Sequence, residues 1–224
     1  MQATLEQLLL AERKAARLFQ EIESRRLIQS GIFESELNTA IYDLAFELFQ
    51  LETYWHKRIV RAGENTLLPY TENPIDRILA EDEILFLDFG PIFEEWEADF
   101  GRTFVIGSNP LKIKLKSDVE RAWHEAKTWI ISQDELTGAA VYAYVKDLAT
   151  QYGWTLGGEI AGHLIGKYPH EKLEPKNYAL YIHPENHNFL FSKKTNNFGK
   201  NWILEIHFVD EKNKIGGFFE QVLV

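Results

Sequence analysis

Two acidic residues accompany a pair of apolar segments that have the length of β-strands. Asp88 lies in Ile84–Phe89, and Asp99 immediately precedes Phe100–Ile106. If the two segments form a hairpin centred just after Phe93, Asp88 lies directly opposite Asp99. Like charges that face each other across a sheet destabilise it, so this pattern predicts a positive group between the two aspartates.

A second pair of carboxylates follows the same pattern near the end of the sequence. Glu205 lies in Trp202–Val209, Glu220 lies in Gly217–Val224, and a short polar segment separates these two apolar segments. A hairpin centred just after Lys212 puts Glu205 directly opposite Glu220. The sequence therefore predicts two opposed acidic pairs.

A histidine framed by glycines, His163 in Gly162–Gly166, lies between the two predicted hairpins. Four carboxylates and one imidazole form an oxygen-rich donor set that suits one or two divalent cations. Two such ions close together would make a hydrolytic centre.

Helices with apolar stripes are expected to position these strands. The order helix, helix, hairpin occurs twice, with a seam near Pro110, which predicts two similar halves of one domain, about 1–110 and 111–224. The fold class is α+β, with helices on one side of a largely antiparallel sheet. The predicted helices are Thr4–Gln29, a second one with Ser35 as its N-cap, Asp118–Ile131 and Glu135–Tyr152, and Tyr178–His183 is predicted as a further strand.

Length, charge and residue content limit the kinds of protein that this chain can be. With 224 residues and 45% hydrophobic content, the chain can bury the core of one domain. The net charge of −10 argues against nucleic acid or an anionic membrane as a partner. There are no cysteines, no apolar segment of membrane-spanning length and no basic region ahead of an apolar N-terminal segment. We therefore expect a cytoplasmic protein.

The sequence resembles the pita-bread metallopeptidases, which include methionine aminopeptidase, Xaa-Pro aminopeptidase, prolidase and the related creatinase. The resemblance covers essentially the whole chain and implies two similar helix–helix–hairpin halves around a dinuclear metal site. It is closest to the catalytic domain of Xaa-Pro aminopeptidase. The matching segments are Leu87–Gly90, Ala98–Phe104, Gly162–Gly166 and Phe219–Val224.

The resemblance also implies the ligands of two divalent metal ions. Asp88 would bind one ion, His163 and Glu205 would bind the other, and Asp99 and Glu220 would bridge the pair. Manganese is the metal that we expect first, although cobalt, iron and zinc also accept such ligands.

Catalytic roles follow from the same resemblance, and three departures bear on them. Glu205 matches the family's general acid/base, and His170 matches a histidine that contacts the scissile carbonyl. Pro69 stands where the related enzymes have a substrate-facing histidine, and Glu205 is followed by Ile206 and His207 rather than proline. The chain also has the size of a bare methionine aminopeptidase domain, without the N-terminal domain of the larger relatives. His207 lies two residues beyond Glu205 on the same strand face, and a role in supporting the metal ligands is left open for it.

The favoured function is that of a dinuclear metal-dependent hydrolase, an aminopeptidase or dipeptidase of Xaa-Pro type, that acts on short peptides or peptide N-termini. Methionine aminopeptidase is an alternative favoured by chain length, and a catalytically weakened binding protein is one favoured by Pro69. Side-chain preference and a homodimeric state are left open. The remaining histidines are interpreted as surface or packing residues, namely His56, His124, His183 and His187.

Overall fold

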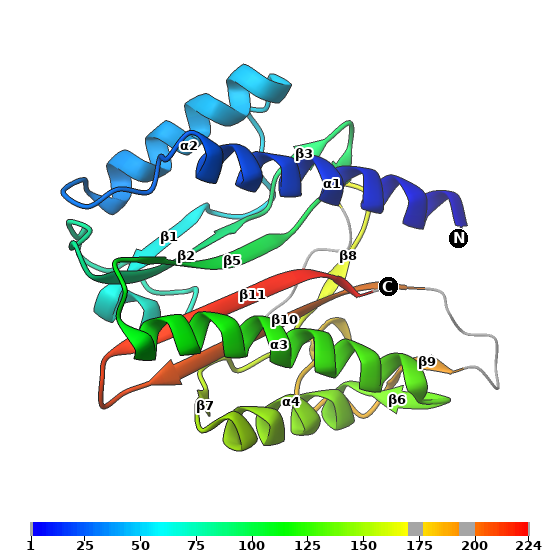
Figure 1. Cartoon of the computed structure of the whole chain (residues 1–224). Helices are drawn as coiled ribbons and strands as arrows, with labels where there is room; N and C mark the ends of the chain where they lie inside the picture. Colours follow the sequence, from blue (N-terminus) through cyan, green and yellow to red (C-terminus); the bar gives the residue numbers. More distant parts are fainter. Residues whose placement is uncertain (1, 170–176, 193–199, 224) are drawn as a thin grey trace.

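The computed structural model describes residues 2–169, 177–192 and 200–223. An antiparallel sheet runs through the molecule in the order β1-β2-β5-β11-β10-β7, and β8 also pairs with β10 (Figure 1). Its strands are β1 (Ile59–Ala62), β2 (Glu83–Phe89), β5 (Phe100–Ile106), β7 (Thr155–Leu156), β8 (Leu164–Ile165), β10 (Asn201–Asp210) and β11 (Ile215–Leu223). Two small sheets pair β3 (Ile92–Phe93) with β4 (Trp96–Glu97), and β6 (Glu135–Thr137) with β9 (Phe189–Ser192).

Two pairs of helices cover this sheet. Figure 1 shows α1 and α2 beside β1, β2 and β5, and α3 beside β10 and β11 with α4 next to α3. The α+β class is therefore confirmed. None of the helices in the described part of the chain is long and apolar enough to cross a membrane. The helices are α1 (Gln2–Ser24), α2 (Glu34–Phe49), α3 (Pro110–Ser132) and α4 (Gly138–Tyr152), and short 3-10 helices span Gly63–Leu67 and Tyr178–Leu180.

Strand alternation separates the core of the protein from its acidic residues. Successive side chains of a strand point to opposite faces. On β2 and β10 one face packs into hydrophobic clusters with the helices, while Asp88 and Glu205 occupy the alternate positions. The apolar side chains on the helix-covered face are Leu85, Leu87 and Phe89 of β2 and Leu204, Ile206 and Phe208 of β10.

The register of the two hairpins was predicted correctly in one case only. Glu205 pairs with Glu220, as expected. Asp88 pairs with Gly101 instead of Asp99, so the first prediction was wrong. The hairpin turns at Glu94 and Glu95, which have φ of 52° and 75° and connect β3 to β4. Two positive φ values suit the tight turns that match strand twist. Because the pairing shifts by two residues, Asp88 and Asp99 become diagonal neighbours.

Several predicted boundaries also need correction in the first half. Helix α1 ends at Ser24 rather than near Gln29, and Arg26 then adopts a left-handed conformation with φ of 54°. Helix α2 is capped by the Glu36 carboxylate, which accepts a hydrogen bond from the Phe33 backbone N–H at 2.7 Å. The hydroxyl of Ser35, the predicted cap, instead donates to Asp76 at 2.6 Å.

The second half shows three similar corrections. Helix α3 begins at Pro110, well before Asp118, because the Asn109 side chain accepts from the N–H of Leu111 and caps the helix. Helix α4 begins after Thr137, so its predicted first residues belong to β6. The predicted strand Tyr178–His183 begins as a 3-10 helix, and only an isolated bridge joins Tyr181 to His163.

The two halves meet where β5 lies beside β11. Gly101 pairs with Glu220, and a Cβ atom on Gly101 would lie 2.5 Å from the Phe218 ring. The Arg102 guanidinium donates to the Glu220 carbonyl at 2.7 Å. The Thr103 hydroxyl accepts from the Phe218 N–H at 2.6 Å and donates to its carbonyl at 2.8 Å. This junction brings Glu220 close to the aspartates of the other half.

Candidate metal centre

The five predicted ligands all line one cavity of about 900 Å³ on the sheet face away from the helices. Asp88 comes from β2, Glu205 from β10 and Glu220 from β11, while Asp99 immediately precedes β5. His163 comes from the segment before β8. The fold thus brings together residues from five separate segments of the sequence.

A glycine allows His163 to approach the sheet. Gly162 has φ of +142°, and a Cβ atom there would lie 2.0 Å from the Ile203 carbonyl oxygen. Close contact with β10 is secured because the Ile203 N–H donates to the His163 carbonyl at 2.8 Å. The glycine frame noticed in the sequence therefore has a steric cause.

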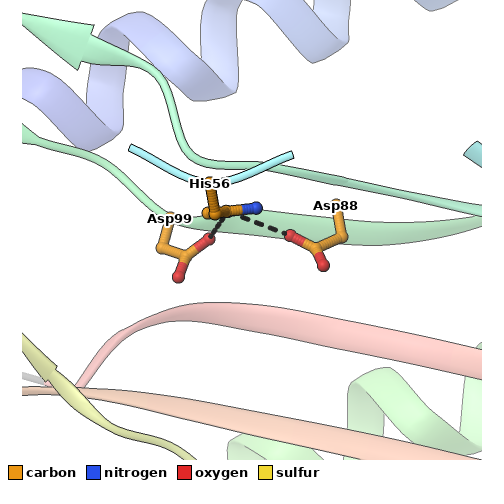
Figure 2. A group of neighbouring side chains, drawn as sticks. All are labelled: His56, Asp88 and Asp99. Carbon is orange, nitrogen blue, oxygen red and sulfur yellow. Dashed lines mark hydrogen bonds and ion pairs between the residues drawn. The ribbon is translucent and has the colours of Figure 1, made fainter. Parts of the chain in front are cut away.

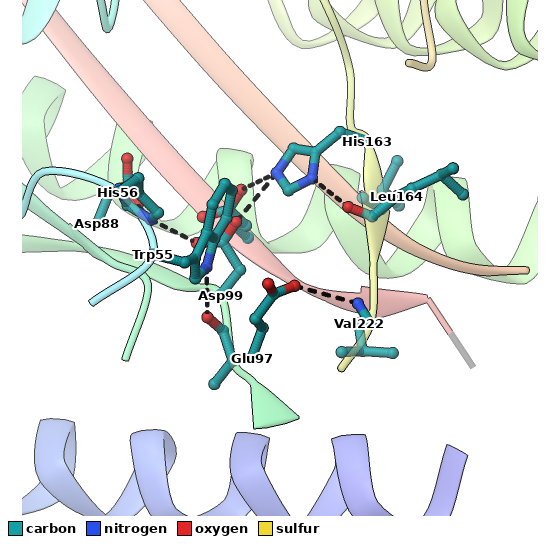
Figure 3. A network of polar contacts seen from close by, with 12 residues as sticks. Trp55, His56, Asp88, Glu97, Asp99, His163, Leu164 and Val222 are labelled. Carbon is teal, nitrogen blue, oxygen red and sulfur yellow. Dashed lines mark hydrogen bonds and ion pairs between the residues drawn. The ribbon is translucent and has the colours of Figure 1, made fainter. Parts of the chain in front are cut away.

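Two groups of candidate ligand atoms share Asp99. One contains Asp99, His163 and Glu220, and the other contains Asp88, Asp99 and His56, with the atoms of each group within 4.8 Å of one another. Figure 2 shows the second group, and Figure 3 shows how His163 faces Asp99 from the other side. The His163 Nε2 atom lies 3.0 Å from Asp99 Oδ2 and 3.9 Å from Glu220 Oε1.

The donor set fits a pair of cations. Asp88 Oδ1 and Glu220 Oε2 are buried and have no hydrogen-bond partner among the described residues. An unpaired buried carboxylate oxygen is costly, so these atoms indicate a missing positive partner. In the described part of the chain, the ion-pair partners of Asp88, Asp99 and Glu220 are imidazoles, which cannot balance all four carboxylates.

The pKa values of the carboxyl groups reflect this crowding. Burial, together with the charges of Asp99 and Glu205, raises the pKa of Asp88 to about 7. Burial and the other carboxylates raise the pKa of Glu220 well above its usual value. Burial also raises the pKa of Asp99, but His56 and His163 outweigh it and hold that pKa at about 2. Without cations the cluster therefore retains protons that bound metal would displace.

One residue at this site was not predicted. His56 was interpreted as a surface or packing residue, but its Nε2 atom lies 3.1 Å from Asp99 Oδ1 and 3.6 Å from Asp88 Oδ1. It precedes β1 and belongs to no periodic pattern. No local sequence signal marks it, because its segment is positioned by the pairing of Tyr54 with Pro91, which only the fold creates.

The other histidines have varied surroundings. His207 lines the same cavity but is largely buried, its Nε2 contacts the Thr66 carbonyl oxygen at 2.7 Å, and burial lowers its pKa to about 4. His183 lines the cavity and stacks on Tyr178 with 4.2 Å between ring centroids, which agrees with the packing role that was one of its two interpretations. His124 and His187 are exposed. His170, the predicted catalytic histidine, lies outside the described residues.

The loop that carries Pro69 forms part of the cavity wall, between Leu68 and Tyr70. The buried Arg61 guanidinium holds this loop by donating to the carbonyls of Leu68 and Glu72. A proline side chain has no donor to offer a substrate at this wall.

Comparisons with known proteins agree with this geometry. A profile of metallopeptidase family M24 matches residues 6–208. The fold is similar to that of an X-Pro aminopeptidase from Thermotoga maritima, with 22% identity over 99% of this chain and 58% of that one and a TM-score of 0.78. A dipeptidase from Pyrococcus horikoshii is 25% identical over 95% of this chain and 54% of that one, with a TM-score of 0.72.

A methionine aminopeptidase from Rickettsia prowazekii is also similar, with 13% identity, coverage of 99% of this chain and 93% of that one, and a TM-score of 0.74. Comparison of the sequence with curated proteins gives no match. The chain spans 58% and 54% of the Thermotoga and Pyrococcus proteins, respectively.

Proposed function

The chain belongs to metallopeptidase family M24 and has its pita-bread fold, and on this premise we propose that it is a dinuclear metal-dependent peptidase. Its substrates would be short peptides or peptide N-termini, with cleavage of Xaa-Pro bonds. The observation that carries the proposal is the pair of ligand groups that share Asp99. In the part of the chain that the structure describes, one oxygen each of Asp88 and Glu220 in these groups is buried without a hydrogen-bond partner.

The residues divide into two sets of metal ligands in this proposal. Asp88 would hold one ion, His163 and Glu205 the other, and Asp99 and Glu220 both. Two bound divalent cations would supply Lewis acidity towards the scissile carbonyl and an activated water. Glu205 lines the cavity beside them. From that position its carboxylate would accept a proton from the water and deliver it to the leaving amine.

The cavity walls support a substrate with an apolar ring next to the cleaved bond. Tyrosines at 70, 168, 178 and 181 and Ile160 line the cavity around the carboxylates. Its volume of about 900 Å³ suits a short peptide. The Thermotoga relative is named as an X-Pro aminopeptidase, which supports proline after the cleaved bond, and the Pyrococcus relative is named as a dipeptidase, which supports a short peptide.

The test uses the full chain, stripped of metal and reloaded with Mn²⁺, Co²⁺ or Zn²⁺. Matched peptides would differ only in proline or alanine at the second position, and Met-Ala peptides would be assayed beside them. We expect release of the N-terminal residue from Xaa-Pro peptides. Glu205→Gln should lower kcat by about 10²–10⁴, the usual contribution of general acid–base catalysis. His187→Ala, at an exposed position, is the control and should behave like the natural chain.

Other outcomes would favour the alternatives. Preferential cleavage of Met-Ala peptides would identify a methionine aminopeptidase. Peptide binding without turnover by the metal-loaded chain would identify a weakened binding protein, the second candidate, which Pro69 favours. A single domain over residues 1–224, the cytoplasmic location and the absence of nucleic-acid or membrane partners stay predictions from the sequence, and a homodimeric state stays open.

A further inference from the structure

His56 is held beside the aspartates by the segment in which it lies. The Trp55 backbone N–H donates to the Gly90 carbonyl at 2.9 Å, and the Ile92 N–H donates to the Thr53 carbonyl at 3.0 Å. The Trp55 indole N–H donates to the Ala98 carbonyl at 3.0 Å. The segment is therefore fastened to the chain on both sides of the β3–β4 hairpin, close to both aspartates.

The ring of His56 occupies a place that the chain leaves open for it. Gly90 has no side chain, and a Cβ atom there would lie 2.2 Å from Cδ2 of His56. The Trp55 ring packs against His56 at 4.4 Å and against His163 at 5.3 Å between ring centroids. Figure 3 shows Trp55 between the two imidazoles. Both rings are thus oriented by one indole.

The two imidazoles contact Asp99 in the same way. His163 Nε2 lies 3.0 Å from one carboxylate oxygen of Asp99, and His56 Nε2 lies 3.1 Å from the other. The Nδ1 atom of each ring contacts the carbonyl of the next residue, Lys57 at 2.7 Å and Leu164 at 2.8 Å. A histidine that donates from Nδ1 to a backbone carbonyl presents the lone pair of Nε2, as metal-binding histidines commonly do.

Asp88 completes this arrangement. Its Oδ1 atom faces His56 Nε2 at 3.6 Å, beyond hydrogen-bonding distance, and is buried without a hydrogen-bond partner among the described residues. Two atoms that bind one metal ion lie near each other without a hydrogen bond between them, because both point at the ion. Asp88 Oδ1 and His56 Nε2 are arranged in this way.

We propose that His56 is an additional metal ligand, whose Nε2 binds the cation held by Asp88 and Asp99. This inference rests on the proposed dinuclear function. Each ion would then have one imidazole ligand, His56 on one side of Asp99 and His163 on the other. An imidazole ligand favours zinc, cobalt and iron over manganese, whereas a set of oxygen ligands alone suits manganese. The metal position beside Asp88 should therefore discriminate against manganese.

An alternative interpretation of the same contacts is a protonated imidazole that replaces one cation. The two interpretations predict opposite effects of removing the ring. If His56 is a ligand, its loss weakens binding of one ion. If it replaces a cation, its loss frees a position for an additional ion.

The experiment is a Co²⁺ titration of the metal-free full chain, followed by calorimetry and visible absorption. We expect two ions per chain, and His56→Gln should weaken binding of one ion by at least about 100-fold, since loss of even an indirect partner costs 10–100-fold. His163→Gln should weaken binding of the other ion, and His187→Gln should change neither. Circular dichroism would establish that each variant is folded.

X-ray absorption of the natural chain saturated with Zn²⁺ counts its imidazole ligands without any variant. We expect about one imidazole per ion, whereas a site with His163 as its sole imidazole would give about one half. Three results would overturn the inference and leave the dinuclear proposal standing. They are unchanged binding of two ions by folded His56→Gln, tighter binding of a second ion by that variant, and the lower imidazole count. Fewer than two ions in the natural chain would overturn both.

Discussion

Asp99 is the residue on which the candidate site depends most. Its two carboxylate oxygens each contact an imidazole, at 3.0 and 3.1 Å, and it belongs to both groups of candidate ligands. Its low pKa keeps it ionised through the neutral range, while its acidic neighbours retain protons without metal. A carboxylate in this position can serve two cations at once.

Metal loading should therefore respond unequally to loss of the individual acids. Asp99→Ala and Glu220→Ala each remove an oxygen pair that both ions use in the proposed assignment, whereas Asp88→Ala affects one ion. We expect the first two variants to retain less metal per chain after dialysis than the third, as measured by plasma mass spectrometry on folded protein. Equal metal content in the three variants would contradict the bridging roles.

Pro69 should limit turnover. A donor that acts mainly in the transition state contributes about 10²–10³ in rate, and proline offers neither a side-chain donor nor a backbone N–H. We expect weak activity on Xaa-Pro peptides at full metal occupancy. Pro69→His should restore part of this contribution and raise kcat/KM by at least about tenfold. The measurement is steady-state kinetics, with Pro69→Leu as an apolar control. Natural turnover at about 10–10³ per second would show that Pro69 is no defect.

At the scale of elements, the register of each hairpin follows from its turn. Residues 211–214 form the short turn between β10 and β11, so symmetry about that turn predicted the pairing of Glu205 with Glu220. In the first hairpin the turn lies one position later than expected, at Glu94 and Glu95. Sequence periodicity identified the strands and their buried faces, but it gave no information on where a turn of unusual residues would form.

The difference between local sequence pattern and contacts made only in the fold also explains which site residues were predicted from the sequence. Asp88, Glu205 and Glu220 interrupt apolar runs, and His163 is framed by glycines, so local pattern marked them. His56 lies in a segment without regular structure, and it reaches the site because Trp55 pairs with residues that lie far along the chain. Such a contact depends on the assembled fold. The helix ends were misjudged for a related reason, since caps such as Glu36 and Asn109 lie outside the apolar periodicity.

Gly162 should be essential for the approach of His163 to β10. In Gly162→Ala the new Cβ would lie 2.0 Å from the Ile203 carbonyl oxygen, in addition to the strain of a positive φ. Gly153→Ala is a matched control, because Gly153 also has positive φ but nothing lies within 4 Å of its Cβ position. We expect the control to lose about 1–2 kcal/mol of unfolding free energy and Gly162→Ala to lose more. Urea denaturation measures both, and equal losses would contradict the steric role.

The whole molecule consists of two helix-covered halves whose sheet halves join beside the site. Separate hydrophobic clusters support the two helix pairs, and Arg102 and Thr103 of β5 tie the first half to β11. The acidic cluster lies at this junction, so its charge opposes the association of the halves unless cations balance it.

Without metal, the contribution of Asp88 and His56 to stability should therefore fall as pH rises. The pKa of Asp88 is raised from 3.8 to about 7, so the folded protein binds more protons than the unfolded chain and loses stability as pH rises through about 7. The pKa of His56 is raised from 6.5 to about 9, so its contribution is complete below 6.5 and is lost as pH rises through about 9. Both groups therefore make the metal-free protein less stable as pH rises.

Bound cations should offset this loss, because they stabilise the native state and compete with the retained protons. We expect the difference in Tm between metal-loaded and metal-free protein to grow from about pH 5 to pH 9, as measured by differential scanning calorimetry. Asp88→Asn should reduce this growth. A difference that is the same at every pH would contradict the account.

In the proposed site, two divalent cations are bound around Asp99. An anomalous difference map tests this without any variant, from crystals of the full chain grown with Zn²⁺ and measured at the zinc absorption edge. We expect two peaks about 3.5–4 Å apart, one beside Asp88 and one beside His163, with Asp99 between them. A map with no peak at these carboxylates, or with a single peak at saturating Zn²⁺, would contradict it.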